Sequence, residues 1–139
     1  MISGDCLRIL VLDDDVPFLE SFRDLLVQDG HCVWSATCGA EAVELARVVP
    51  LDLSFLDFDL PDLNGLETFV RIHRQRPDLP AVFVSGSTSR ELERRIIDVG
   101  AFGLIRKPFE PRALRVVIRE ATFRTSPFDG AEGDTRWRS

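Results

Sequence analysis

Short apolar runs alternate with longer amphipathic stretches along the chain up to about residue 123. Each apolar run ends at a polar or turn-forming residue, as buried strands do, and several runs are rich in the β-branched and aromatic residues that favour strands. We predict strands over residues 7–12, 31–36, 51–57, 81–85 and 101–105.

An amphipathic stretch follows each of these runs and predicts a helix. Its apolar residues recur three and four positions apart, so that one face of the helix is apolar. Asp15 before Pro17 is typical of a helix start, and Gly30 is typical of a helix end. Thr88 and Glu91 have capping-box spacing, which predicts Thr88 as an N-cap. We expect helices over residues 16–29, 39–49, 65–76, 89–99 and 111–123.

The regular alternation of strands and helices predicts the architecture. Strands that are apolar on both faces must be covered on both faces, which favours an α/β fold with a doubly wound parallel sheet. A chain of 139 residues suits one domain. We expect this domain to span residues 1–123, because residues 124–139 are rich in Gly, Ser and charged residues and predict a flexible C-terminal tail.

The composition argues against several classes of function. The net charge is −6 at pH 7 and no run of Lys and Arg forms a basic stripe, which argues against direct nucleic-acid binding. No apolar run is long enough to span a membrane or to act as a signal segment. Cys6, Cys32 and Cys38 are an odd number of cysteines without a CxxC pair, so we expect reduced thiols that pack as small core residues in a cytoplasmic protein.

Side chains that can carry chemistry follow four of the predicted strands. In an open parallel sheet the carboxyl ends of the strands share one edge, and ligands bind beyond that edge. We therefore expect carboxylates, a hydroxyl group and an ammonium group to converge there. In chain order these residues are Asp13, Asp14, Asp57, Asp59, Ser85 and Lys107.

This set of side chains suits a cation and a phosphoryl group. Carboxylates a few ångströms apart repel one another, so one of them must bind a proton or the group must bind a cation. Hard oxygen ligands favour Mg²⁺, with Mn²⁺ as an alternative. Metal, lysine and hydroxyl together can position a transferring phosphoryl group, and an aspartate can accept it as an aspartyl phosphate.

The motifs ILVLDDD, FLDFDLPDLNG, VFVSG and KPF occur in this order along the chain. Through them, residues 6–123 resemble the receiver domain of two-component response regulators. The resemblance implies a flavodoxin-like sheet of strand order 2-1-3-4-5 with five helices. It also implies a phosphoacceptor signalling domain that is not an enzyme, except that it catalyses its own phosphotransfer and dephosphorylation.

The same resemblance assigns roles to the residues at the strand ends. Asp57 matches the phosphoacceptor, which is also a metal ligand. Asp13 and Asp14 match the acidic pair that binds Mg²⁺, with Asp14 as the more direct ligand. Ser85 matches the hydroxyl position of the family, and Lys107 matches its lysine.

The resemblance also implies partners. The phosphodonor would be a sensor histidine kinase or a histidine phosphotransfer protein. The signal would pass to a downstream protein through the face made by the fourth helix, the fifth strand and the fifth helix. Some relatives form homodimers through this face on phosphorylation, and this chain is a candidate for the same. No membrane association is expected.

Three positions depart from the family pattern. Leu104 stands three residues before the lysine, where an aromatic residue is usual, and Phe102 is expected to share a face with Leu104 by strand alternation. Gly86 follows Ser85 where alanine is common. Asp59 would offer its backbone carbonyl to the metal, but it is acidic where many relatives have an apolar or amide residue. We hypothesise that its side chain alters the lifetime of the phosphoryl group.

Two other functions stay open at this stage. The DFD triplet at residues 57–59 resembles the DxD motif of phosphatases of the haloacid dehalogenase type. That motif usually follows the first strand and precedes a Gly-Thr pair, whereas here it follows the third strand and precedes Leu60-Pro61. The chain could also be a degenerate receiver that acts as an unphosphorylated adaptor. Such a protein would lack the acid pair, the acceptor or the lysine, and all of these are present.

Overall fold

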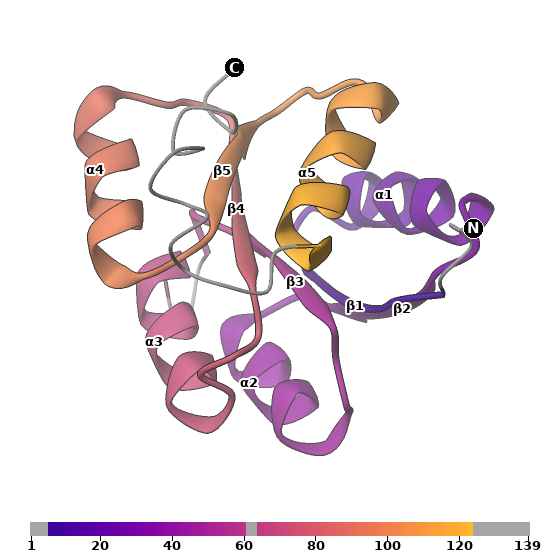
Figure 1. Cartoon of the computed structure of the whole chain (residues 1–139), viewed down its shortest axis with the longest axis horizontal. Coiled ribbons are helices and arrows are strands. Elements are labelled where there is room, and N and C mark those ends of the chain that lie inside the picture. The colour runs from indigo at the N-terminus through magenta and orange to yellow at the C-terminus, as the bar shows by residue number, and fades with distance from the viewer. Residues whose placement is uncertain (1–5, 61–63, 124–139) are drawn as a thin grey trace.

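The computed structural model describes residues 6–60 and 64–123 (Figure 1). The predicted tail over residues 124–139 and the middle of the turn after the third strand lie outside the described residues. The elements are β1 (Arg8–Leu12), α1 (Val16–Gln28), β2 (Cys32–Ala36), α2 (Gly39–Val48), β3 (Leu53–Asp57), α3 (Gly65–Gln75), β4 (Ala81–Ser85), α4 (Arg90–Val99), β5 (Gly103–Arg106) and α5 (Pro111–Phe123).

The strands form one parallel sheet in the order β2-β1-β3-β4-β5, which confirms the predicted fold class and strand order. The chain places β2 on one side of β1 and every later strand on the other side. Connections from β1 and β3 therefore diverge, and a crevice opens beyond their carboxyl ends. Leu12 pairs with Leu56 in the register of β1 and β3, so Asp13 and Asp57 lie next to each other at this crevice.

Helices cover both faces of the sheet (Figure 1). On one face, α1 and α5 pack through Phe22 and Leu114 in a buried cluster that includes Phe55. On the other face, α2, α3 and α4 pack against a second cluster, in which Phe69 contacts Phe83 with ring centroids 5.9 Å apart. All residues of β3 and β4 are buried, as expected for central strands covered on both sides. Among the described residues, no helix has both the length and the apolar character that a membrane span requires.

The start of α4 differs from the prediction by one residue. Ser89 is the N-cap, because it is the last residue with extended backbone angles before Arg90. Its hydroxyl oxygen accepts a hydrogen bond from the backbone N–H of Leu92 at 3.1 Å. The prediction that Thr88 caps this helix was therefore wrong.

The predicted fifth strand begins two residues too early. β5 starts at Gly103, so Phe102 precedes the strand. Phe102 packs with the cluster under α1 and α5, whereas Leu104 is buried in the cluster under α2, α3 and α4. Alternation of side chains holds only within a strand, and the expectation that Phe102 and Leu104 share a face was wrong.

The cysteines do not lie in the core, and this prediction was also wrong. Cys6 and Cys32 are exposed, and Cys38 is half-buried. Cys32 opens β2, which is an edge strand whose residues are exposed or half-buried until Ala36. An edge strand leaves room for solvent that the central strands do not, and apolar composition alone does not distinguish the two.

The start of α3 packs directly on the end of β3. The side chain of Asn64 caps the helix by accepting a hydrogen bond from Glu67 N at 2.8 Å, and Gly65 N donates to Phe58 O at 2.8 Å. A Cβ on Gly65 would lie 2.6 Å from Phe58 Cα and 2.7 Å from Asp57 O. These neighbours are backbone atoms that cannot move aside, so only glycine allows the helix to support the backbone that carries Asp57.

We predict that Gly65→Ala lowers the free energy of unfolding by roughly 2–3 kcal/mol, because the new methyl group forces backbone to move. Gly86→Ala is the matched control, since a Cβ there would meet no atom within 4 Å and its backbone is not left-handed. We expect this control to change the free energy by less than about 1 kcal/mol. Urea unfolding followed by circular dichroism measures both, and equal midpoints for the two variants would contradict the prediction.

Candidate functional site

Three carboxylates meet at the crevice beyond β1 and β3. Asp13 is 2% exposed and Asp57 is 5% exposed, whereas Asp14 is exposed to solvent. One carboxylate oxygen from each of these residues lies within 4.8 Å of the others. The structure thus brings together the side chains of three of the four predicted metal-binding residues, and the fourth, Asp59, was expected to contribute only its backbone carbonyl.

Lys107 supplies the opposite charge from the loop after β5. Its Nζ lies 2.7 Å from Asp13 Oδ2 and 4.0 Å from Asp57 Oδ1. Its backbone N–H donates to Ser85 O at 2.8 Å, which ties the lysine to the end of β4. Nζ also lies 4.4 Å from the ring centroid of Phe18, at a distance suited to a cation–π contact. Phe18 lies in α1, and no motif at the strand ends pointed to its contact with the site.

Backbone N–H groups hold two of the carboxylates in place. Asp15 N donates to Asp13 Oδ1 at 2.9 Å, and Asp59 N donates to Asp57 Oδ1 at 3.2 Å. The carboxylate of Asp15 accepts a hydrogen bond from Phe18 N at 3.3 Å and caps α1. Asp15 is therefore a helix cap. Asp59 has an exposed side chain that is not part of the carboxylate cluster.

The pKa of Asp57 is raised by its surroundings. Burial, followed by the charge of Asp13, raises this pKa from 3.8 to about 6, although the charge of Lys107 opposes the change. Burial also disfavours the charged form of Lys107. The hydrogen bond to Asp13 and the charges of Asp13 and Asp57 outweigh this effect and raise the pKa of Lys107. Lys107 therefore stays protonated and neutralises only part of the negative charge.

The donor set fits Mg²⁺ or Mn²⁺. Three carboxylates face one ammonium group, so the crevice keeps an excess of negative charge that a divalent cation would balance. The ligand atoms are hard carboxylate oxygens, and the exposure of Asp14 leaves space for the waters that Mg²⁺ retains. Asp13, Asp14 and Asp57 are the residues that would hold the ion.

Ser85 stands at the same edge of the sheet, but its hydroxyl group is engaged within its own turn. Ser85 Oγ donates to Ser87 O at 2.7 Å, and Ser87 N lies 3.3 Å from Ser85 Oγ in a return hydrogen bond. The side chain is 1% exposed. A Cβ on Gly86, the next residue, would meet no atom within 4 Å.

Fold and site together define a flavodoxin-like α/β protein whose topological switch point holds an acidic crevice and an opposed lysine. The family model of the response regulator receiver domain matches residues 9–119 of the chain. The chain therefore belongs to the response regulator receiver domain family of two-component systems.

Known relatives agree with this assignment. Response regulator MprA of Mycobacterium leprae is 35% identical over 126 residues, which cover 91% of this chain and 55% of MprA. The alginate biosynthesis transcriptional regulatory protein AlgB of Pseudomonas putida is 30% identical over 129 residues, which cover 88% of this chain and 29% of AlgB. The chain thus spans about half the length of these curated relatives, or less.

Solved structures share the fold. A CheY-like response regulator receiver domain protein from Methanospirillum hungatei JF-1 has a TM-score of 0.79 and 32% sequence identity, and the match covers 84% of this chain and 93% of that protein. The receiver domain of HemR from Leptospira biflexa, solved without phosphorylation, has a TM-score of 0.79 and 31% identity, with 87% and 98% covered.

We predict that Asp57→Asn stabilises the metal-free protein at pH 8 by roughly 1–3 kcal/mol. The folded-state pKa of Asp57 is about 6, above the ordinary 3.8, so folding becomes less favourable as pH rises from about 4 to above 6. Asparagine has nearly the same shape and does not ionise. The stabilisation by Asp57→Asn should be smaller by half or more at pH 4.5.

Urea unfolding in the presence of a chelator measures this gain, with Asp24→Asn as the control at an exposed carboxylate. Mg²⁺ at pH 8 should stabilise the wild type more than Asp57→Asn. If Asp57→Asn were less stable than the wild type at pH 8, the prediction would be wrong, because ionised Asp57 would then not destabilise the folded protein.

Proposed function

We propose that the chain accepts a phosphoryl group on Asp57 from a phosphohistidine partner, with Mg²⁺ bound at Asp13, Asp14 and Asp57. One observation carries this proposal: Asp57 ends β3 in a buried crevice where two further carboxylates and Lys107 face it. When bound, Mg²⁺ supplies charge neutralisation for the carboxylates and for the phosphoryl oxygens.

The contacts of Asp57 suggest which oxygen reacts. Asp59 N and Lys107 Nζ both approach Oδ1, so we assign attack on phosphorus to Oδ2. An O–P bond forms at Oδ2 while the N–P bond of phosphohistidine breaks, and the imidazole leaves with the electron pair and takes up a proton. Lys107 moves its ammonium group from Asp13 to a phosphoryl oxygen, which holds the transferred group by charge.

The structural change that follows phosphorylation would begin at the hydroxyl group of Ser85. Breaking the hydrogen bond from Ser85 Oγ to Ser87 O lets Oγ donate to the phosphoryl group, and the turn leading into α4 then moves. Leu104 is buried and aliphatic, so no aromatic side chain at this position reorients with the hydroxyl. We infer that α4, β5 and α5 present the altered face to a downstream protein or to a second copy of the chain.

The proposed phosphodonor is a sensor histidine kinase or a histidine phosphotransfer protein in the cytoplasm. In this role the chain turns over no external substrate beyond its own phosphorylation and dephosphorylation, and it contacts nucleic acid only through partners. The family match favours this reading over a phosphatase. Because Asp13, Asp57 and Lys107 are all present and close together, an unphosphorylated adaptor is the weaker alternative.

Labelling with a small acyl phosphate, acetyl phosphate, tests the assignment directly. We expect the wild type with Mg²⁺ to gain the mass of one phosphoryl group and to lose it again over time. The gain should fall to background in Asp57→Asn and in the presence of a chelator, because the nucleophile or the metal is then absent. Arg47→Gln changes an exposed arginine paired with Glu44 and should be labelled like the wild type.

Intact mass spectrometry measures the label, and hydrolysis of para-nitrophenyl phosphate distinguishes the phosphatase. A receiver gives one label per chain with little turnover. Continuous turnover that depends on Asp57 would overturn the proposal in favour of a phosphatase, and absence of label in the folded wild type would favour the adaptor.

We further expect Asp59→Asn to lengthen the half-life of the aspartyl phosphate by about twofold or more. The exposed carboxylate of Asp59 follows the acceptor closely and can take a proton from the attacking water, which an amide cannot do. The decay of the label after removal of acetyl phosphate gives the half-life. Asp78→Asn, at an exposed position on another loop, is the control, and half-lives equal within error would refute a role for the Asp59 side chain.

A further inference from the structure

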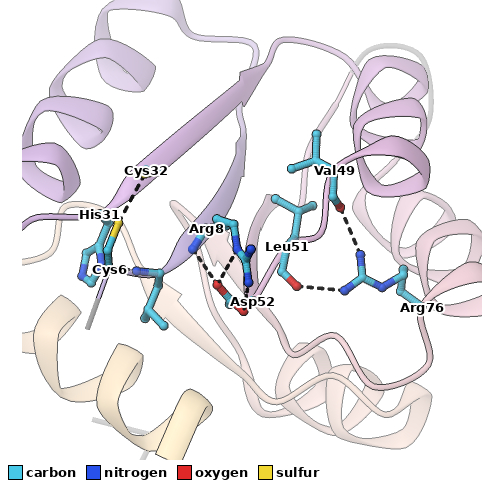
Figure 2. A network of polar contacts seen from close by, with 9 residues as sticks. Cys6, Arg8, His31, Cys32, Val49, Leu51, Asp52 and Arg76 are labelled. Carbon is cyan, nitrogen blue, oxygen red and sulfur yellow. Dashed lines mark hydrogen bonds and ion pairs between the residues drawn. The ribbon is translucent and has the colours of Figure 1, made fainter. Parts of the chain in front are cut away.

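Two thiols lie in contact at the edge of the sheet opposite the acidic crevice. Cys6 precedes β1 and Cys32 opens β2, and their Sγ atoms are 3.3 Å apart (Figure 2). Both side chains belong to exposed residues. The distance from this pair to the start of the crevice is roughly 20 Å, since one full strand separates them. The proposed phosphorylation makes no use of either thiol.

The backbone on both sides of the pair is held in place. Cys32 N donates to Leu7 O at 2.9 Å, and Leu7 N donates to His31 Nδ1 at 3.2 Å. Arg8 pairs with Cys32 in the parallel register, and the hydrogen bond from Cys32 N to Leu7 O keeps the residue before Leu7 beside the start of β2. The contact between the thiols is therefore fixed by the pairing of β1 with β2.

Neighbouring groups affect the acidity of the thiols. The hydrogen bond with Cys6, and then the charge that Cys6 carries when ionised, raise the pKa of Cys32, while Arg8 opposes this change. The raised pKa disfavours the thiolate form of Cys32, and either thiol can donate the hydrogen bond between the two sulfur atoms. Arg8 is held nearby by Asp52, whose Oδ2 accepts from Arg8 Nε at 3.2 Å (Figure 2). An exposed cysteine whose thiolate is favoured by the charge of a nearby cation is the reactive kind.

We propose that Cys6 and Cys32 form a reversible intramolecular disulfide by exchange with a small-molecule disulfide. The Cys6 thiolate attacks one sulfur of the small molecule, forms a mixed disulfide and releases the other half as a thiolate. Cys32 loses its proton to that thiolate or to solvent, attacks Cys6 Sγ and expels the second half. Two cysteine thiols are oxidised, one disulfide is reduced to two thiols, and the atoms balance.

The geometry favours closure of this pair over other reactions. The sulfur atoms must approach from 3.3 Å to about 2.05 Å, and Cys6 precedes the first hydrogen-bonded residue of β1, so its side chain can adjust. Cys38 differs, because it is half-buried at the N-cap of α2. A bond between residues 26 apart would close a loop that contains all of α1 and would restrict the unfolded chain.

The experiment uses the full chain in a series of reduced and oxidised glutathione mixtures, followed by acid quenching, alkylation and intact mass spectrometry. We expect the wild type to lose two alkylation sites together and to stay monomeric. Peptide mapping without reductant should join the peptide of Cys6 to that of Cys32. The melting temperature should rise by roughly 5–10 °C on oxidation, as expected when a bond closes a loop of this length.

Cys38→Ser is the matched control and should form the same bond, whereas Cys6→Ser and Cys32→Ser should not. Covalent dimers, glutathione adducts alone, or a wild type that keeps all its thiols would overturn the proposal. Should a serine variant fail to fold, the peptide map of the wild type decides the question by itself. Labelling by acetyl phosphate is a separate readout, so loss of either property leaves the other measurable.

Arg8 offers a second test of the same site. Arg8→Gln removes the positive charge beside the thiols and should slow disulfide formation at pH 7 by roughly twofold to fivefold. Arg47→Gln, which removes another exposed arginine from an ion pair on α2, should leave the rate unchanged. Equal rates for both variants would show that the thiols react without help from Arg8 and would remove the assigned role of the guanidinium group.

Discussion

The pairing of Lys107 with Asp13 organises the end of the sheet where the chemistry lies. Removing two charges from water is costly, and the contact at 2.7 Å offsets that cost only because β1, β3 and β5 bring the groups to one crevice. Asp57 lies 4.0 Å from the same ammonium group and is left only partly neutralised. The fold therefore holds Asp57 in an unfavourable arrangement, which a bound cation would relieve.

The backbone around this crevice has little freedom to relax the strain. Asp13 and Asp57 each accept a hydrogen bond from the N–H two residues ahead, so the loop after each strand fixes its carboxylate. Gly65 brings α3 against the backbone of Asp57 and Phe58 at a distance that no side chain allows. Because these contacts hold the carboxylates together, burial and then the charge of Asp13 raise the pKa of Asp57.

The sequence was sufficient for those features that follow from periodicity. Alternating strands and helices predicted the parallel sheet, and the polar residues at strand ends placed Asp13, Asp14, Asp57 and Lys107 at one edge, where the structure has them. Features that depend on packing were not predictable. The turn of Ser85 toward Ser87 O is a local hydrogen bond, and the close approach at Gly65 is to the backbone of Asp57 and Phe58, but neither contact leaves a trace in the hydrophobic pattern. The cysteines were misplaced because hydropathy does not tell an edge strand from a central one.

The two edges of the sheet differ in how firmly their loops are held. At the amino edge, Arg8 binds Asp52, and Arg76 donates to Val49 O at 3.2 Å and to Leu51 O at 2.8 Å (Figure 2). These contacts join the starts of β1 and β3 to the end of α3. At the carboxyl edge, the turn that carries Ser85 is held by hydrogen bonds between Ser85 and Ser87 and has open space at Gly86. Under the phosphorylation proposed above, movement would be confined to the Ser85 turn, because Asp13 and Asp57 are held by the loops that follow their strands.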